Sequence, residues 1–241
     1  MKIAVQYYTL RDDYKTPEEF LGLFKEVKAL GFEGIEFAGY CGLAPEVIRA
    51  ALDEAGLVAV GCHVGTDTFD GEENLAKTIE TAKILGMPIV GTGGAYHDTK
   101  EDIDRLHRIY KAANEAGAKD GIRFYYHNHS GEFDTEIDGK MCLDLIAEEA
   151  YLQVDTYWSF HAEVDNYEFI TQHKDRIVSL HIKDGVDGSP KALGEGECDL
   201  AAVIRAAKDI GLEWLVLEND KPEPTGLADI ARSMAYLKAN V

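Results

Sequence analysis

The chain has 241 residues, of which 46% are hydrophobic and 28% are charged. Its 24 lysines and arginines against 44 aspartates and glutamates give a formal net charge of −20, which argues against DNA, RNA or an anionic membrane as a partner because such binding needs basic side chains. No stretch approaches the apolar length of a membrane span, and the first residues lack the features of a signal peptide. We therefore expect a cytoplasmic protein.

Eight β-rich runs alternate along the chain with amphipathic helical segments. The predicted strands are Ile3–Tyr8, Gly34–Ala38, Val58–His63, Pro88–Gly91, Ile122–Asn128, Leu152–Asp155, Ile177–Lys183 and Trp214–Glu218. The predicted helices between them are Pro17–Leu30, Ala44–Ala55, Glu73–Leu85, Lys100–Ala116, Met141–Glu148, Tyr167–His173 and Ala201–Ile210. Several of these helices end at a glycine, the usual residue just past a helix C-terminus.

This order of elements predicts an α/β fold, a closed (β/α)₈ TIM barrel, as a single domain over residues 1–241. Eight β/α repeats fit the usual length of that barrel. The alternative is a doubly wound sheet, which should carry a glycine-rich phosphate-binding turn after the first strand. The segment Tyr8–Asp12 contains no glycine, so we favour the barrel.

The alternation of side chains along each strand separates residues that face the barrel interior from residues that face the helices. The predicted interior residues are Ala4, Gln6 and Tyr8 in the first strand, Glu36 in the second, Ala59, Gly61 and His63 in the third, and Ser179, His181 and Lys183 in the seventh. Val60 is predicted to face the helices. Polar residues thus gather at the C-terminal ends of the strands, where barrel active sites are built.

The last four predicted strands finish in acids and histidines. They supply His127, His129 and Glu132 from the fifth strand, Asp155 from the sixth, His181, Lys183 and Asp184 from the seventh, and Glu218 and Asp220 from the eighth. Carboxylates and histidines from different strand ends can bind a divalent cation, while a carboxylate or lysine moves a proton. Taken singly, Asp155 also fits a helix N-cap, and each histidine also fits a structural role.

Several short motifs occur in one order along essentially the whole chain. They are Gln6–Arg11, Gly34–Gly39, Tyr126–Phe133 with its HNHxxEF pattern, Asp155–Trp158 with His161, His181–Asp184, Gly194–Gly196 and Glu218–Asp220. In this order the chain resembles the xylose-isomerase-like TIM-barrel superfamily, also called sugar phosphate isomerases/epimerases. That superfamily includes ketose 3-epimerases and inosose dehydratases.

The resemblance implies a divalent metal ion, with Mn²⁺ first and Zn²⁺, Co²⁺ or Mg²⁺ as alternatives. Motif by motif, it implies Glu132, Asp155, His181 and Glu218 as the ligands. The fifth-strand ligand is open between Glu132, His127 and His129, because many relatives end that strand in Glu-Asn-His whereas this chain has His127-Asn128-His129. Glu132 is the first choice.

The same resemblance implies roles for the other site residues. Glu132 and Glu218 would form an acid/base pair, and Lys183 would stabilise an enolate oxygen or transfer a proton, with a solvated rim lysine as its alternative. The expected substrate contacts are His63, His127, His129, Trp158, Glu36 and Gln6.

The resemblance also implies a metal-dependent isomerase or epimerase that abstracts a proton next to a metal-bound carbonyl of a carbohydrate or keto-sugar, through an enediolate. One alternative is a dehydratase or lyase acting on keto-inositols or 3-keto-glycosides, since those reactions begin with the same proton abstraction. An apurinic-site endonuclease would need more metal ligands and a basic groove. A non-catalytic sugar-binding barrel stays open, as do the sugar, its phosphorylation and the native metal. Because relatives often form dimers or tetramers, a homo-oligomer is an expectation.

Overall fold

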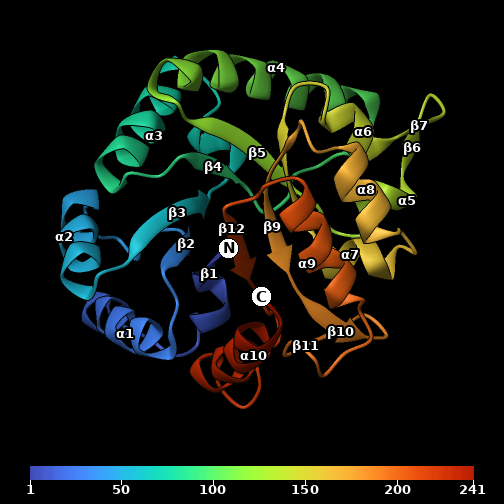
Figure 1. The fold of residues 1–241 in the computed structure, drawn as a ribbon. Helices are drawn as coiled ribbons and strands as arrows, with labels where there is room; N and C mark the ends of the chain where they lie inside the picture. Colours follow the sequence, from blue (N-terminus) through green and yellow to red (C-terminus); the bar gives the residue numbers. More distant parts are fainter.

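The computed structural model describes residues 1–241 as a closed barrel of parallel strands with helices around it (Figure 1). The barrel order is β1-β12-β9-β8-β5-β4-β3-β2, and β1 pairs with both β2 and β12 to close the ring. The strands are β1 Lys2–Gln6, β2 Gly34–Ala38, β3 Val58–His63, β4 Ile89–Thr92, β5 Arg123–His127, β8 Tyr151–Asp155, β9 Ile177–Ile182 and β12 Trp214–Leu217. The predicted TIM barrel is therefore confirmed.

The main helices follow the strands and cover the outside of the barrel. They are α1 Pro17–Leu30, α2 Pro45–Ala55, α3 Glu72–Leu85, α4 Lys100–Gly117, α6 Cys142–Ile146, α8 Asn166–Gln172, α9 Leu200–Asp209 and α10 Gly226–Asn240. The first begins at a capping box of Thr16 and Glu19 and ends at Gly31, which has a left-handed conformation and so satisfies orphan backbone groups at both ends. Seven predicted helices are present within a few residues, whereas α10 was not among them.

The loops between the barrel strands and the main helices contain further short elements. They are the helices α5 Gly131–Asp134 and α7 Thr156–His161, the 3₁₀ turns η1 Tyr7–Leu10, η2 Thr66–Thr68 and η3 Ala118–Asp120, and two small ribbons, β6 Glu136–Ile137 with β7 Lys140–Met141 and β10 Asp184–Val186 with β11 Ser189–Lys191. Both α5 and α7 lie just after barrel strands and carry site residues. No helix is long and apolar enough to cross a membrane.

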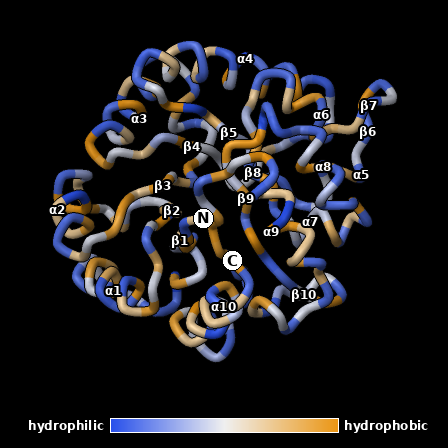
Figure 2. Tube along the Cα trace, viewed as in Figure 1, coloured by the Kyte–Doolittle hydropathy of each residue, from blue (hydrophilic) through white to orange (hydrophobic).

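Two apolar clusters fill the structure. The larger contains 52 buried residues, and apolar residues recur between hydrophilic ones along the surrounding helices (Figure 2). The smaller consists of Ala4, Val60 and Val216 with Trp214 packed against them. Ala4 pairs with Val216 in the ladder of β1 and β12, below the polar residues that follow two positions later on each strand.

The interior position of Val60 corrects the predicted alternation of β3. Ile35 pairs with Ala59 but the next residue, Glu36, pairs with Gly61, so Val60 is an extra residue in the ladder. Such a β-bulge changes the face that a side chain occupies. Ala59 consequently joins the large outer cluster and Val60 the inner one, while Cys62 still packs outside.

Candidate functional site

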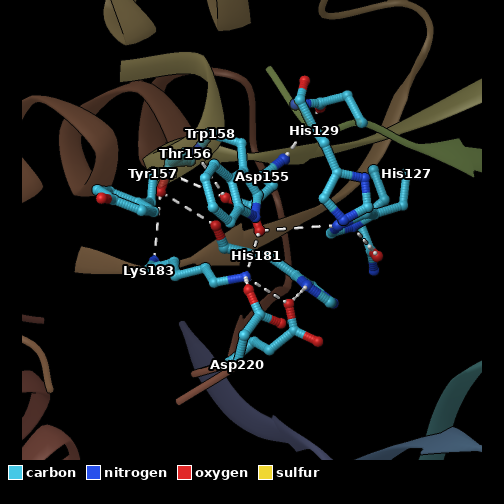
Figure 3. A network of polar contacts seen from close by, with 12 residues as sticks. His127, His129, Asp155, Thr156, Tyr157, Trp158, His181, Lys183 and Asp220 are labelled. Carbon is cyan, nitrogen blue, oxygen red and sulfur yellow. Dashed lines mark hydrogen bonds and ion pairs between the residues drawn. The ribbon is translucent and has the colours of Figure 1, made fainter. Parts of the chain in front are cut away.

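Four buried side chains from four consecutive barrel strands meet at the C-terminal end of the barrel. His127 ends β5, Asp155 ends β8, His181 lies in β9 and Glu218 follows β12. Their ligand-type atoms all lie within 4.8 Å of one another. The carboxyl ends of parallel barrel strands converge there, so residues separated by more than 90 positions share one cluster (Figure 3).

Lys183 is completely buried at the edge of this cluster (Figure 3). Its Nζ donates to Asp155 Oδ2 at 3.1 Å and to Glu218 Oε2 at 3.0 Å, and it forms an ion pair with Asp220. Burial alone would lower the pKa of Lys183, but these three carboxylates raise it above its ordinary value. The side chain is therefore a buried ammonium ion rather than a solvated rim lysine.

His181 lies between two carboxylates. Its Nε2 contacts Glu36 Oε2, and its Nδ1 lies 2.9 Å from Glu218 Oε2. Burial would lower the pKa of His181, but Glu218 and Glu36 raise it to about 10. Burial would likewise raise the pKa of Glu36, yet His181 and His63 lower it to about 2. His181 is thus an imidazolium in the metal-free protein, with Nε2 held by Glu36 and Nδ1 directed at Glu218, and a metal ion bound at Nδ1 would replace the proton there.

Glu36 lies beneath the cluster at the centre of a buried hydrogen-bond network. It accepts hydrogen bonds from Gln6 Nε2 at 2.8 Å, Tyr125 OH at 2.7 Å and Gln153 Nε2 at 2.6 Å. Neither Gln6 nor Glu36 lines the pocket above the cluster. The structure therefore places these two predicted substrate contacts in the buried network beneath His181 and outside the lining of that pocket.

Gln153 in β8 orients two histidines at once. Because its Nε2 donates to Glu36, its Oε1 accepts from His63 Nε2 at 2.6 Å and from His127 Nδ1 at 3.0 Å. Burial lowers the pKa of both histidines, so each is neutral. The free lone pair of His127 is then on Nε2, which lies 3.7 Å from Asp155 Oδ2. Sequence reasoning missed Gln153, although a glutamine inside an otherwise apolar strand was a usable signal.

Asp155 uses its two oxygens for different purposes. Its Oδ1 accepts from the backbone N–H groups of Tyr157 at 3.0 Å and Trp158 at 2.9 Å, which caps α7. Its Oδ2 faces Lys183 and His127. Burial raises the pKa of Asp155 against the opposing effect of Lys183. The helix-cap and ligand interpretations of this residue are thus compatible.

Glu132 lies outside the four-residue cluster. It is buried in α5, where Oε1 accepts from Tyr126 OH at 2.8 Å and Oε2 accepts from the backbone N–H of His129 at 2.8 Å. These bonds hold the turn that carries His127 and His129. The fifth-strand residue that the structure brings to Asp155, His181 and Glu218 is His127.

A pocket of about 460 Å³ opens above the cluster. It is lined by Tyr8, Ala38, His63, Gly93, His127, His129, Trp158, Glu218 and Asp220. Four of the predicted substrate contacts, His63, His127, His129 and Trp158, are among these residues. The indole of Trp158 and the ring of His129 lie 5.9 Å apart between centroids, so they form one wall together.

The cluster fits a divalent metal ion. The imidazoles of two histidines and the carboxylates of Asp155 and Glu218 suit ions such as Mn²⁺, Zn²⁺ and Co²⁺. Each histidine also donates its other ring N–H to a buried acceptor, His181 to Glu36 and His127 to Gln153, which is the second layer that orients metal-binding histidines.

Comparisons with known proteins agree with this architecture. A family model described as xylose isomerase-like TIM barrel matches residues 24–240. A sugar phosphate isomerase/epimerase from Parabacteroides distasonis has 22% identity and a TM-score of 0.82, covering 98% of this chain and 97% of its own.

Two further solved structures have a similar fold. A D-allulose 3-epimerase from Methylomonas sp., in complex with D-allulose, has 18% identity and a TM-score of 0.74, covering 100% of this chain and 97% of its own. A probable 3-DHS dehydratase involved in petrobactin synthesis from Bacillus anthracis has 15% identity and a TM-score of 0.77, with 99% of each chain covered. No curated protein matches the chain.

Proposed function

The chain belongs to the xylose isomerase-like TIM barrel family, and from that premise we propose that it is a metal-dependent sugar isomerase or epimerase. The observation that carries the proposal is the buried cluster of His127, Asp155, His181 and Glu218 at the floor of a pocket of about 460 Å³. Solved structures with this fold include enzymes named for reactions on D-allulose and L-ribulose.

The four cluster residues would hold the ion, with His127 taking the fifth-strand position that the resemblance gave first to Glu132. A divalent ion bound there supplies Lewis-acid polarisation of a carbonyl group. Mn²⁺ remains the expected metal, with Zn²⁺, Co²⁺ and Mg²⁺ as alternatives. A cytoplasmic location and a homo-oligomeric state also remain predictions.

Glu218 is the residue that we assign as the base. It lines the pocket, and although burial raises the pKa of its carboxyl group, Lys183 and His181 hold that pKa well below its usual range. Glu218 is therefore ionised, which is the state that can accept a proton from a carbon next to the substrate carbonyl, and its place in the pocket lining is the basis of the assignment. Lys183, 3.0 Å from Glu218, would stabilise the negative charge that develops on the substrate oxygen.

Solvent deuterium exchange into a panel of ketoses, inososes and 3-keto-glycosides tests this proposal. The metal-loaded protein should exchange deuterium at a carbon beside the carbonyl of its substrate. Glu218→Gln should lower that exchange by orders of magnitude, whereas Glu46→Gln, on the exposed surface of α2, should leave it unchanged. Normal exchange in Glu218→Gln would remove this residue from the role of base.

The dehydratase or lyase alternative begins with the same proton abstraction, so product analysis in that assay separates it. Loss of water or of a glycosidic substituent after exchange would identify a lyase, and return of the proton to carbon would identify an isomerase or epimerase. A non-catalytic barrel would show no exchange and no tightly held metal.

A further inference from the structure

Resting on the proposed function, we infer that the pocket takes an unphosphorylated sugar, because the chain's own carboxylates fill the places where a phosphate group would bind. TIM barrels commonly bind phosphate through the loops after the seventh and eighth strands together with a helix N-terminus beside them. In this barrel those loops follow β9 and β12.

The loop after β9 wraps around the carboxylate of Asp184. Its Oδ1 accepts from the backbone N–H groups of Gly185 at 2.9 Å and Cys198 at 3.1 Å, and its Oδ2 from those of Gly194 at 2.9 Å and Gly196 at 3.0 Å. Four converging N–H groups form the kind of backbone nest that binds anions. Here the anion is the buried Asp184 itself.

The fit around Asp184 is close enough to require glycine. A Cβ atom added at Gly196 would lie 2.1 Å from Asp184 Oδ1, so no larger residue fits without movement of the carboxylate or the loop. The carboxylate and the loop therefore form one built unit. A phosphate group would have to displace Asp184 to reach these N–H groups.

The loop after β12 leads into α10, and its N-terminus is also occupied. Thr225 Oγ1 accepts from the N–H of Ala228 at 3.2 Å, and Asp13 Oδ2 accepts from the N–H of Leu227 at 2.7 Å. A second carboxylate, Asp229, is buried in the first turn of the helix. Asp13 and Thr225 thus already satisfy two of the N–H groups at this helix N-terminus, and the carboxylates of Asp13 and Asp229 lie at the positive end of the helix dipole.

The charged residues that line the pocket are both acidic, Glu218 and Asp220. The buried cation beside them, Lys183, is shared among three carboxylates. Arg11 donates from Nη1 to the carbonyl of Tyr8 at 2.9 Å and from Nη2 to the carbonyl of Asp220 at 2.7 Å. Apart from the metal ion itself, a phosphate dianion in the pocket would therefore face the carboxylates of Glu218 and Asp220, while the nearby cations Lys183 and Arg11 are already engaged in hydrogen bonds.

The remaining lining groups suit a neutral polyol. Tyr8 and Trp158 offer flat apolar faces, while His63, His129 and Asp220 offer donors and acceptors for hydroxyl groups. Flat rings with a few polar groups around them are the usual composition of a small-molecule pocket. The substrate class that fits is thus a free ketose or keto-sugar.

Paired ligands test this inference independently of turnover. The metal-loaded Trp214→Phe variant retains Trp158 as its single tryptophan, and its fluorescence or calorimetry can follow binding of D-fructose against D-fructose 6-phosphate and of D-ribulose against D-ribulose 5-phosphate. We expect the neutral member of a pair to bind at least about tenfold more tightly, and millimolar inorganic phosphate not to displace it.

Three outcomes would overturn the inference. They are equal or tighter binding of the phosphate ester, displacement of the neutral sugar by inorganic phosphate, and binding of neither member of any pair. Deuterium exchange in the same samples tests the proposed function separately. Preferential binding of the neutral sugar without exchange would contradict the enzymatic proposal and leave the substrate class standing. Deuterium exchange into the phosphate ester alone would contradict the inferred substrate class and leave the enzymatic proposal standing.

A charge introduced at the pocket gives a second test. Ala38 is exposed at the end of β2 and lines the pocket, so Ala38→Arg adds a cation and Ala38→Gln adds a neutral polar side chain as the matched control. We expect Ala38→Arg, and not Ala38→Gln, to reduce the preference for the neutral ketose by about tenfold. Equal preference in the two variants would overturn the electrostatic basis of the inference.

Discussion

The two ends of the barrel interior are made by the same strands and differ completely in chemistry. On β1, β2 and β12, a small or apolar residue is followed two positions later by a polar or charged one: Ala4 by Gln6, Gly34 by Glu36 and Val216 by Glu218. Two residues along a strand keep the same face and advance about 6.6 Å. One such step therefore separates the small apolar cluster of Ala4, Val60 and Val216 from the buried ionic cluster.

The apolar end stabilises the fold, whereas the ionic end carries the groups proposed for the chemistry. Burial of apolar side chains such as Val60 and Val216 stabilises the folded chain. Buried ion pairs contribute little net stability, because the cost of removing charges from water offsets much of their attraction. We therefore expect substitutions at the apolar end to change stability alone, whereas removal of one charged partner at the ionic end leaves a buried charge unpaired and should change both stability and metal binding.

Lys183→Met should produce the largest loss of stability, because it leaves Asp155, Glu218 and Asp220 without their shared cation. The free energy of unfolding of the metal-free protein should fall by about 3 to 5 kcal/mol, and addition of Mn²⁺ should restore part of it. Chemical denaturation with and without metal measures both effects. Lys77→Met, at an exposed pair with Glu73, is the control, and an equally small change in both variants would contradict the prediction.

Acid should weaken the ionic end selectively. The pKa of Glu36 is lowered in the folded state from 4.5 to about 2, so its contribution to stability is fully present above about pH 4.5 and is lost as the pH falls toward 2. That contribution is about 3 kcal/mol. The stability difference between the wild type and Glu36→Gln should shrink by this amount across that range in denaturation curves. A difference that is independent of pH would show that ionised Glu36 gains nothing from His181.

Val60→Ala tests the apolar end. This substitution removes two methyl groups from the small apolar cluster that Val60 forms with Ala4 and Val216. It should lower the free energy of unfolding by about 2 kcal/mol. Metal affinity, measured by calorimetric titration, should stay within a factor of about two, since Val60 packs with Ala4 and Val216 at the other end of the barrel interior. A large loss of metal affinity would show that the two ends are coupled through the interior.

Glu132→Gln should have the smallest effect on stability among these substitutions. It tests whether the glutamate of the HNHxxEF motif is a metal ligand. We expect metal affinity to be unchanged and stability to fall by about 1 kcal/mol, because the bonds to Tyr126 and to the N–H of His129 weaken. His127→Gln is the comparison and should lower metal affinity at least about tenfold. The opposite ranking of the two variants would return the ligand role to Glu132.

The local sequence predicts the barrel strands and the ring of strand-end residues well. Strand formation is local, and parity alone brings His181 and Lys183 to the same interior face as Glu36. The position of Val60 could not be predicted because a bulge depends on pairing with β2. Glu132 lies beyond the end of its strand, where the direction of the turn and the contact with Tyr126 come from tertiary packing. The cradle around Asp184 joins residues up to 14 positions apart in a loop without regular pattern.

Asp155 has a consequence for how substitutions at this site are interpreted. One carboxylate both starts the helix that carries Trp158 and faces the cluster, so Asp155→Ala would remove two properties at once and its defect could not be assigned to either. Asparagine is an equally good N-cap but lacks the charge. Asp155→Asn therefore keeps the start of α7 and the position of Trp158 in the pocket wall while it removes one negative charge from the cluster.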